Sequence, residues 1–502
     1  MHSVDTPDVV ERRSDVVVAE AKYKQLNSEL QELDLKRKDI REHLDTLKVG
    51  IEGHKIALAA HIHSRIPAEV FSEIFQYCCV TDALDVFNRE GPQQHQWILS
   101  AVCRRWRTIA LSTPQLWSSL HFDVAYAIRN HFRDIAGIAR EILQRSGRVR
   151  LAVTLDMHAH RHRLISVLLK ESSRWRSFRL ILRLHKSSHK MVAMLNDQGG
   201  NFPVLEALAV EITGDLPAPL TAFETCPKLR TVVLSGESLV RNVAVPWGQI
   251  TRFSGLQLRI VDNPHRLLQN MPAVQHAVIN LSDYRSSIDT PKEPTLFSDM
   301  LSLHLSGPCL FIQYTILPAL TELSMESCDL LEEHYTSLFS QVGGSLTTLE
   351  LGNLKTALGI RLSTFQHLAR LERLEIFSRF DIDSTIYNGM AATGTGAVIF
   401  PNLCILHLGF RISITAPLLR MLYSRIMFRH VNARSPASLD RVFIGYKAVT
   451  DDLHDRMSAL HGNGTHIEFV KDGDPIIKHP GEFEALRCRL STRYGSSAFY
   501  RS

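Results

Sequence analysis

The chain has 502 residues, of which 45% are hydrophobic and 22% are charged, and its formal net charge is +5 at pH 7. These values are typical of a globular protein with room for more than one domain and at least one sizeable core. The weak, spread-out positive charge gives no Lys/Arg footprint for nucleic acid, and no apolar run approaches the roughly twenty residues of a membrane span.

The cysteines point to a reducing compartment. There are eight, they show no Cys-x-x-Cys spacing, and several lie within apolar runs. Such a distribution favours buried free thiols and argues against a disulfide framework or a structural zinc site. The start of the chain is polar and acidic, so we expect no signal peptide. We therefore expect an intracellular protein of the cytoplasm, the nucleus or both.

The first segment with a regular pattern follows a polar start. Residues 1–15 are expected to be disordered. Residues 16–60 are predicted to form a long coiled-coil helix, because apolar residues alternate there in steps of three and four over about five heptads. The seam consists of Tyr23, Leu26, Leu30, Leu33, Arg37, Ile40, Leu44, Leu47, Ile51, His54 and Leu58.

Two interpretations of this helix remain open from the sequence. It pairs with a second copy to make a homodimer through residues 16–60, or it packs as a single helix on the body of its own chain. Arg37 and His54 interrupt the apolar seam, which lowers the stability of a coiled coil and favours a particular register. Gly50 and Gly53 weaken the helix near its end.

Residues 64–122 contain two apolar helical patterns. The first follows Pro67, which suits the first turn of a helix because its missing N–H costs nothing there. Ile66, Val70, Ile74 and Cys78 recur at helical spacing, with Phe71 and Phe75 widening the apolar stripe. A short helix that is apolar over most of its circumference must be buried on two sides, and a small domain supplies only one. We therefore expect another protein on the second side.

The second pattern lies further along the same stretch. Trp97, Leu99, Ala101, Val102, Trp106, Ile109 and Ala110 predict another amphipathic helix, which Thr113-Pro114 ends. Between the two patterns, a polar insertion from Thr81 to Gln96 leaves the start of the second helix open. Leu116, Trp117 and Leu120 then supply an apolar plug that closes the module against the residues that follow.

These residues resemble the F-box family. The resemblance rests on three motifs in chain order: Ile66-Pro67-x-Glu69-Val70-x-x-x-Ile74-Phe75, then Val102-Cys103-Arg104-Arg105-Trp106, then Thr113-Pro114-x-Leu116-Trp117. More narrowly, the stretch is similar to the F-box of a large fungal set that couples this motif to degenerate leucine-rich repeats. The resemblance implies a small three-helix module at residues 64–122 that docks on the Skp adaptor and, through it, on the cullin scaffold of a ubiquitin ligase.

The resemblance also implies which residues contact the Skp adaptor. They divide between the core of the module and its Skp-facing surface, and the sequence does not separate these two roles. The predicted Skp-binding residues are Ile66, Pro67, Val70, Ile74, Phe75, Val102, Cys103, Trp106 and Trp117.

Residues 123–480 carry a quasi-repeat of the form Leu-x-x-Leu-x-Leu. It recurs at intervals of roughly 25 residues, the length of a leucine-rich repeat with one strand and one helix or turn per unit. Because one unit cannot bury its apolar face alone, we expect an irregular leucine-rich-repeat-like solenoid. Larger gaps indicate skipped or swollen units, and Asn388-Gly389 with the following Gly/Thr run predicts a protruding loop. Residues 481–502 are expected to form a C-terminal tail. Examples of the repeat begin at Leu205, Leu229, Val274, Leu320, Leu346, Leu371, Leu403 and Leu439.

No motif in the sequence proposes catalysis, a cofactor or a metal. His158, His160 and His162 alternate but have no carboxylate or thiol cluster beside them. Gly394-Thr-Gly396 lacks the third glycine of a dinucleotide-binding turn. The fold class that we predict is α+β or α/β: a long helix, a small three-helix module and a solenoid.

The sequence leaves three hypotheses of function. The first is a non-catalytic substrate receptor of a Skp–cullin–F-box ubiquitin ligase, with an unknown protein target on the repeat region. The second is an F-box-containing scaffold outside ubiquitination, oligomerised by its coiled coil. The third, an enzyme, would need a deep pocket with convergent titratable groups.

Overall fold

A computed structural model gives the fold, and it divides the chain into two compact units, Met1–Tyr77 and Cys78–Ser502. The residues that it describes are 7–79, 83–87, 95–157, 162–183, 189–197, 201–214, 216, 218–236, 239–258, 264–281, 293–328, 330–352, 362–377, 382, 384–391, 398–427, 439–446, 460 and 466–471.

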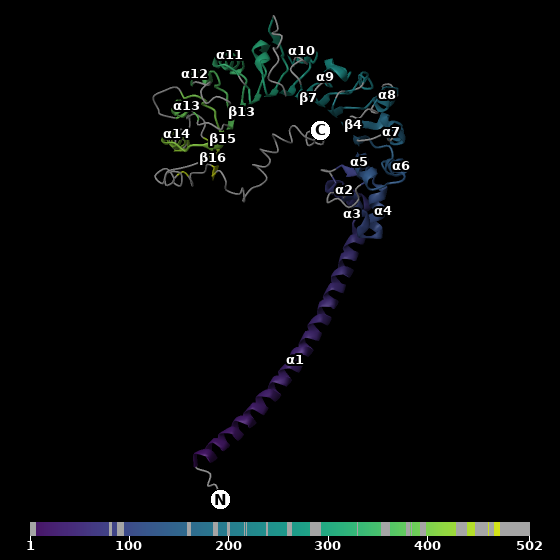
Figure 1. The fold of residues 1–502 in the computed structure, drawn as a ribbon, viewed down its shortest axis with the longest axis vertical. Coiled ribbons are helices and arrows are strands. Elements are labelled where there is room, and N and C mark those ends of the chain that lie inside the picture. The colour runs from purple at the N-terminus through teal and green to yellow at the C-terminus, as the bar shows by residue number, and fades with distance from the viewer. Residues whose placement is uncertain are drawn as a thin grey trace. The chain divides into compact units, whose positions relative to one another are not determined.

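The first unit is dominated by helix α1, Pro7–Arg65, of 59 residues (Figure 1). The helix extends beyond the predicted 16–60 at both ends, and residues 7–15 belong to it rather than to a disordered segment. Gly50 and Gly53 lie inside the helix without interrupting it. All its side chains from Arg12 to Lys55 are exposed, and Leu58 lies outside the side chains that the structure describes.

Three further helices follow, where the sequence predicts a three-helix module. They are α2 (Ala68–Cys78), α3 (His95–Val102) and α4 (Arg104–Ser112), and the 3-10 turn η1 (Pro114–Trp117) follows them in the chain. Part of the predicted insertion forms strand β1, Leu84–Asp85, which pairs in parallel with β2, Ser119–Asp123. The insertion therefore starts a sheet that the rest of the chain extends.

The second unit is built on one parallel sheet of 15 strands, in which strands neighbour one another in chain order apart from β9 and β11. In Figure 1 the strands follow one arc and the helices lie along its outer side. Besides β1 and β2, its strands are β3 (Leu151–Met157), β4 (Trp175–Arg183), β5 (Ala207–Thr213), β6 (Thr231–Ser235), β7 (Arg252–Leu258), β8 (His276–Leu281), β10 (Ser302–Ser306), β12 (Glu322–Glu326), β13 (Thr348–Gly352), β14 (Arg373–Phe377), β15 (Ile405–Ile412), β16 (Arg441–Tyr446) and β17 (His466–Lys471).

Helices and short turns connect consecutive strands, as parallel pairing requires. The helices are α5 (Val124–Arg129), α6 (Ile135–Arg145), α7 (His162–Leu169), α8 (His189–Asp197), α9 (Leu239–Asn242), α10 (Pro264–Gln269), α11 (Glu332–Val342), α12 (Leu362–Phe365), α13 (Ser384–Met390) and α14 (Ala416–Met427). The 3-10 turns η2 (Ser172–Arg174), η3 (Trp247–Gln249) and η5 (Leu310–Tyr314) and a small sheet of β9 (Thr295–Leu296) and β11 (Thr315–Ile316) complete the described elements.

The repeated leucines form the core of this unit, because they stack in register. Leu323, Leu349, Leu374, Leu406 and Val442 are successive pairing partners across five neighbouring strands, and each is at most 1% exposed. A parallel sheet that stacks in this way is compatible with the predicted solenoid.

Two gaps in the predicted repeat do not correspond to skipped units. Strand β7 lies between the units at Leu229 and Val274, and β10 lies between those at Val274 and Leu320. At β7, Ile250 and Phe253 take the places of the first two leucines of the repeat. At β10, Met300 takes the place of the first leucine and Leu303 keeps the second; all four are buried. The pattern was incomplete because other apolar residues fill the same volume.

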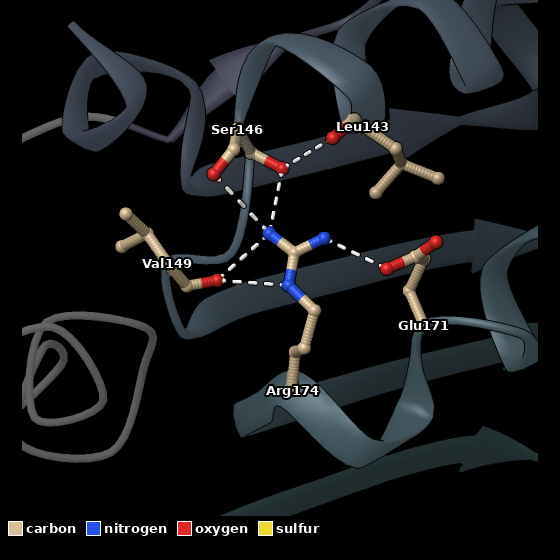
Figure 2. A network of polar contacts seen from close by, with 5 residues as sticks. All are labelled: Leu143, Ser146, Val149, Glu171 and Arg174. Atoms are coloured by element: carbon tan, nitrogen blue, oxygen red, sulfur yellow. Dashed lines mark hydrogen bonds and ion pairs between the residues drawn. The ribbon is translucent and has the colours of Figure 1, made fainter.

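Arginine side chains connect turns of the second unit by donating hydrogen bonds to backbone carbonyl oxygens. Figure 2 shows Arg174 donating from Nε and Nη2 to the carbonyl oxygen of Val149 at 3.0 and 2.8 Å, and from Nη2 to Ser146 Oγ at 2.9 Å. Its Nη1 donates to the Glu171 carboxylate at 2.7 Å. Ser146 is the C-cap of α6, so one side chain joins the end of that helix to the turn before β4.

Cysteine pairing departs from the expectation of free thiols throughout. Cys309 and Cys328 form a disulfide, with Cα atoms 5.7 Å apart. They follow the neighbouring strands β10 and β12, whose register brings the two chain segments together. The sequence did not reveal this because the pairing is set by strand neighbourhood and not by cysteine spacing.

Of the remaining predictions, one is wrong and the others concern residues outside those that the structure describes. Asn388-Gly389 lies in helix α13, Ser384–Met390, and not in a protruding loop. Gly394 and Gly396, His158 and His160, the side chain of His162 and the tail at 481–502 lie outside the described residues.

Candidate interaction surface on the helical module

Helix α2 separates its apolar residues onto two faces. Phe71 and Phe75 are 3% and 0% exposed, and their rings lie 5.9 Å apart. Val70, Ile74 and Tyr77 occupy another side of the helix and remain 44%, 45% and 81% exposed. We call these three residues the α2 stripe. Their spacing of four and then three residues places them in one line along the helix.

The entry to α2 is set by Ile66 and Pro67. Helix α1 ends at Arg65 and α2 begins at Ala68, so these two residues form the turn between the helices. Phe71 N donates to the carbonyl oxygen of Pro67 at 3.4 Å. Pro67 is exposed and Ile66 is half-buried. A proline suits this position, where its N–H would have no helical partner.

Helix α3 shows the same division within the second unit. Gln96, Leu99 and Ser100 are buried, whereas Ile98 and Val102 are 55% and 54% exposed. We call Ile98 and Val102 the α3 pair, because residues four apart lie together on one face of a helix.

The predicted residues on and next to α4 make contacts inside the module. Cys103 is exposed and caps α4, with its Sγ accepting from Trp106 N at 3.4 Å. Trp106 is half-buried. Trp117 is fully buried, and its Nε1 donates to the carbonyl oxygen of Ala110 at 2.9 Å.

The structure therefore sorts the residues that the sequence predicts to bind Skp. Pro67, Val70, Ile74, Val102 and Cys103 are exposed, Ile66 and Trp106 are half-buried, and Phe75 and Trp117 are fully buried. Burial assigns Phe75 and Trp117 to a core rather than to an accessible surface. A direct contact with a partner by these two side chains is not supported by their position.

One residue of each of these two surfaces was absent from the predicted set. Tyr77 extends the α2 stripe, and Ile98 completes the α3 pair. Their helical spacing from Ile74 and from Val102 could have identified them. The family motif covers neither, so reasoning from the motif alone omitted both.

The chemistry of these surfaces is that of apolar contact. Among the residues that the structure describes, no group of three or more His, Cys, Asp or Glu side chains could hold a metal ion. Within the same residues, no helix is both long and apolar enough to cross a membrane. Half-exposed Val and Ile side chains at helical spacing are typical of an interface that a partner covers.

Comparison with known proteins identifies the module. Residues 63–123 match the family described as F-box-like. The matched range contains α2, α3, α4, η1 and β2, and with them both exposed apolar surfaces. A search of curated proteins gave no match.

Proposed function

We propose that this chain, with its F-box-like segment at residues 63–123, is the substrate-recognition adaptor of a Skp–cullin–F-box ubiquitin ligase. The observation that carries the proposal is the coincidence of that segment with two exposed apolar surfaces, the α2 stripe and the α3 pair. Each surface contributes contacts to the Skp adaptor, which in turn binds the cullin. The chain itself is a non-catalytic subunit.

The energetic argument rests on solvent exposure. Burying a Val or Ile side chain contributes roughly 1.5–3 kcal/mol, so a row of such residues left half exposed favours a partner that covers them. Ile74 and Ile98 are the best anchors because they are branched, rigid and about half exposed in the free chain. Val70 and Val102 extend the same two surfaces.

Co-purification of the full chain with the Skp adaptor tests this assignment. Ile74→Asp and Ile98→Asp each place a charge in the proposed contact and should weaken Skp binding at least tenfold. Tyr423→Asp is the matched control, since Tyr423 is 51% exposed on α14, far from the F-box-like segment in sequence. It should bind Skp as the parent does.

Thermal unfolding checks that the variants fold. Both interface variants change exposed side chains and should unfold within a few degrees of the parent. Normal Skp binding by folded Ile74→Asp and Ile98→Asp would overturn the proposed surface. A parent chain that never binds the Skp adaptor would favour the second function, a scaffold that acts outside ubiquitination.

The target is proposed to bind the repeat region, on the face of the sheet that does not carry the stacked leucines. Alternate strand residues occupy that face, among them Arg179 on β4, Ser254 on β7 and Glu350 on β13. Their polarity differs from strand to strand, as a surface of specific recognition requires. We expect the chain to bind its target inside the cell.

A non-degrading variant provides the route to the target. The double variant Ile74→Asp, Ile98→Asp should still bind the target but should not deliver it to the ligase. Proteins recovered with the double variant and with the parent are compared by mass spectrometry. A target should be shared by both and should carry ubiquitin only with the parent; shared proteins that are equally ubiquitinated with both would contradict the assignment.

A further inference from the structure

Helix α1 carries an exposed apolar seam. The seam residues Val16, Tyr23, Leu26, Leu30, Leu33, Ile40, Leu44, Leu47 and Ile51 are 51–71% exposed. An isolated helix gains little stability in water without a packed face. In heptad terms, Val16, Tyr23, Leu30, Arg37, Leu44 and Ile51 occupy a, and Ala19, Leu26, Leu33, Ile40, Leu47 and His54 occupy d.

The charges at the e positions, on one flank of the seam, change sign along the helix. In the first half Glu20 and Asp34 are acidic and Asn27 is neutral, whereas Arg41, Lys48 and Lys55 in the second half are basic. Residues at e and g decide which helix pairs with which and in what orientation. A helix that runs from acidic to basic on one flank is complementary to a reversed copy of itself.

We propose that α1 pairs with α1 of a second copy of this chain as an antiparallel coiled coil, centred between Lys38 and Asp39. Around that centre Leu30 lies opposite Leu47 of the second copy, Leu33 opposite Leu44, and Leu26 opposite Ile51. The flanks then bring Asp34 to Arg41 and Glu20 to Lys55, and two-fold symmetry makes each of these pairs twice.

In a parallel dimer the same charged residues would repel one another. In register, it would place Glu20 beside Asp15, Asp34 beside Glu29, and Arg41 beside Lys36 of the second copy, and every one of these pairs has like charges. It would also set Arg37 against Arg37 within the seam. The antiparallel pairing sets Arg37 against Ile40 instead, while its guanidinium keeps the ion pair with Asp34 of its own helix at 3.1 Å.

The antiparallel register is also fixed by charge. Moving the helices by one heptad in one direction places Asp34 opposite itself, and moving them in the other direction places Arg41 opposite itself. Like charges opposed in this way select against the shifted registers. The other exposed apolar residues, Val17, Val18, Leu35 and Val49, lie off the a and d positions.

The proposal has a geometric consequence. With a rise of 1.5 Å per residue, the two Arg65 residues at the ends of the paired helices would be about 80 Å apart along the coil. A parallel dimer would hold them about 10 Å apart, the usual distance between packed helices. The pairing does not depend on Skp binding, so its test is independent of the proposed function.

Charge reversal distinguishes the two orientations by the sign of its effect. The dimer dissociation constant of the full chain is measured by analytical ultracentrifugation. Arg41→Glu and Asp34→Lys should each weaken an antiparallel dimer roughly tenfold, because each converts two attractive contacts into two repulsive ones. In a parallel dimer each would create two attractive contacts and tighten binding.

The double variant completes the test. Asp34→Lys with Arg41→Glu reverses both members of the pair and should restore the dissociation constant to within about threefold of the parent. Lys24→Glu, a charge change at a b position outside the seam and its flanks, should leave it unchanged. Far-UV circular dichroism confirms that α1 remains helical in each variant.

Disulfide crosslinking provides a second measurement. Full chains with Leu30→Cys and with Leu47→Cys are mixed and oxidised, with the parent as the control for native cysteines. An antiparallel dimer links the two different variants, because only opposed seam positions come within the roughly 7 Å between Cα atoms that a disulfide spans. Self-linked Leu30→Cys dimers, tighter binding by the single charge variants, or a parent that stays monomeric would each overturn the proposal.

Discussion

The indole rings of Trp97 and Trp117 meet edge to face with centroids 5.2 Å apart. Trp97 lies on α3 and Trp117 on η1, and the guanidinium of Arg145, from α6, lies over both rings at 5.3 and 5.0 Å. Because α6 follows the first strands of the sheet, this contact joins the helical module to the start of the repeat region.

Removing the central ring should loosen that junction. Trp117→Ala deletes a fully buried side chain and its hydrogen bond to Ala110, and should lower the free energy of unfolding by about 3–5 kcal/mol. Arg145→Leu should cost about 1 kcal/mol through the lost contact with the two rings. Urea unfolding followed by circular dichroism measures both values.

A control separates the ring contact from the ion pair of Arg145. Arg145 also pairs with Glu141 four residues before it on α6. Glu141→Gln removes the ion pair only and should cost a few tenths of a kcal/mol. Equal losses for Arg145→Leu and Glu141→Gln would show that the rings contribute nothing.

Arg425 should be among the most sensitive polar residues of the repeat region. It is 1% exposed, and it donates to the carbonyl oxygens of Met390, Ile399 and Phe400 at 2.8–2.9 Å. Burial lowers the pKa of Arg425 to about 10, so it remains charged at neutral pH. Phe400 has a φ of 54°, a left-handed conformation that a bulky residue holds only under restraint.

Arg425→Met should therefore destabilise the chain by about 2–4 kcal/mol, because it leaves buried carbonyls without donors. Arg425→Lys should recover only part of the loss, since an ammonium lacks the planar fork that reaches all the acceptors. Differential scanning calorimetry compares the variants. Full recovery with lysine would mean that charge alone, and not the fork, stabilises this turn.

Glu375 should make stability depend on pH in the acidic range. Burial raises the pKa of its carboxyl, but the nearby His407, with Nδ1 3.5 Å from Glu375 Oε1, and the charge of Arg373 outweigh burial and leave the pKa below its ordinary value of 4.5. A carboxyl with a lowered pKa in the folded state stabilises the fold above that ordinary value, and the stabilisation is lost as the pH falls through the lowered pKa.

Glu375→Gln tests this dependence. The difference in unfolding free energy between the parent and the variant should be greatest at pH values above 4.5 and should shrink as the solution is acidified. Chemical unfolding is measured in steps from pH 7 to pH 3. A difference that is constant or grows in acid would show that the ionised carboxylate does not stabilise the fold.

The Cys309–Cys328 disulfide should be detectable and should contribute to stability. Mass spectrometry after alkylation without reductant should find these two residues linked. A bond that closes a loop of this size, with a sequence separation of 19, stabilises by about 3 kcal/mol. Reductant should therefore lower the unfolding temperature of the parent but not that of the Cys309→Ser, Cys328→Ser variant. Recovery of both thiols in alkylated form would contradict the pairing.

The sequence by itself determined the elements that depend on local periodicity. Steps of three and four residues gave the long helix, and Leu-x-x-Leu-x-Leu gave strands such as β12, β13 and β14, because the period of the apolar residues sets which backbone can bury them. The F-box-like segment was found in another way, by the resemblance of its motifs to that family, and the match at residues 63–123 supports it. The exposed side chains Val70, Ile74 and Val102 were in the predicted set.

Tertiary structure alone decided which of these apolar residues are covered. Ile74 and Phe75 are adjacent in the chain and equally apolar, yet one is 45% exposed and the other is fully buried. For the same reason, the sequence did not predict strands β7 and β10, the disulfide of Cys309, or the carbonyl oxygens that accept hydrogen bonds from Arg425. Periodicity gives the faces of an element, whereas burial and pairing depend on which distant segment packs against each face.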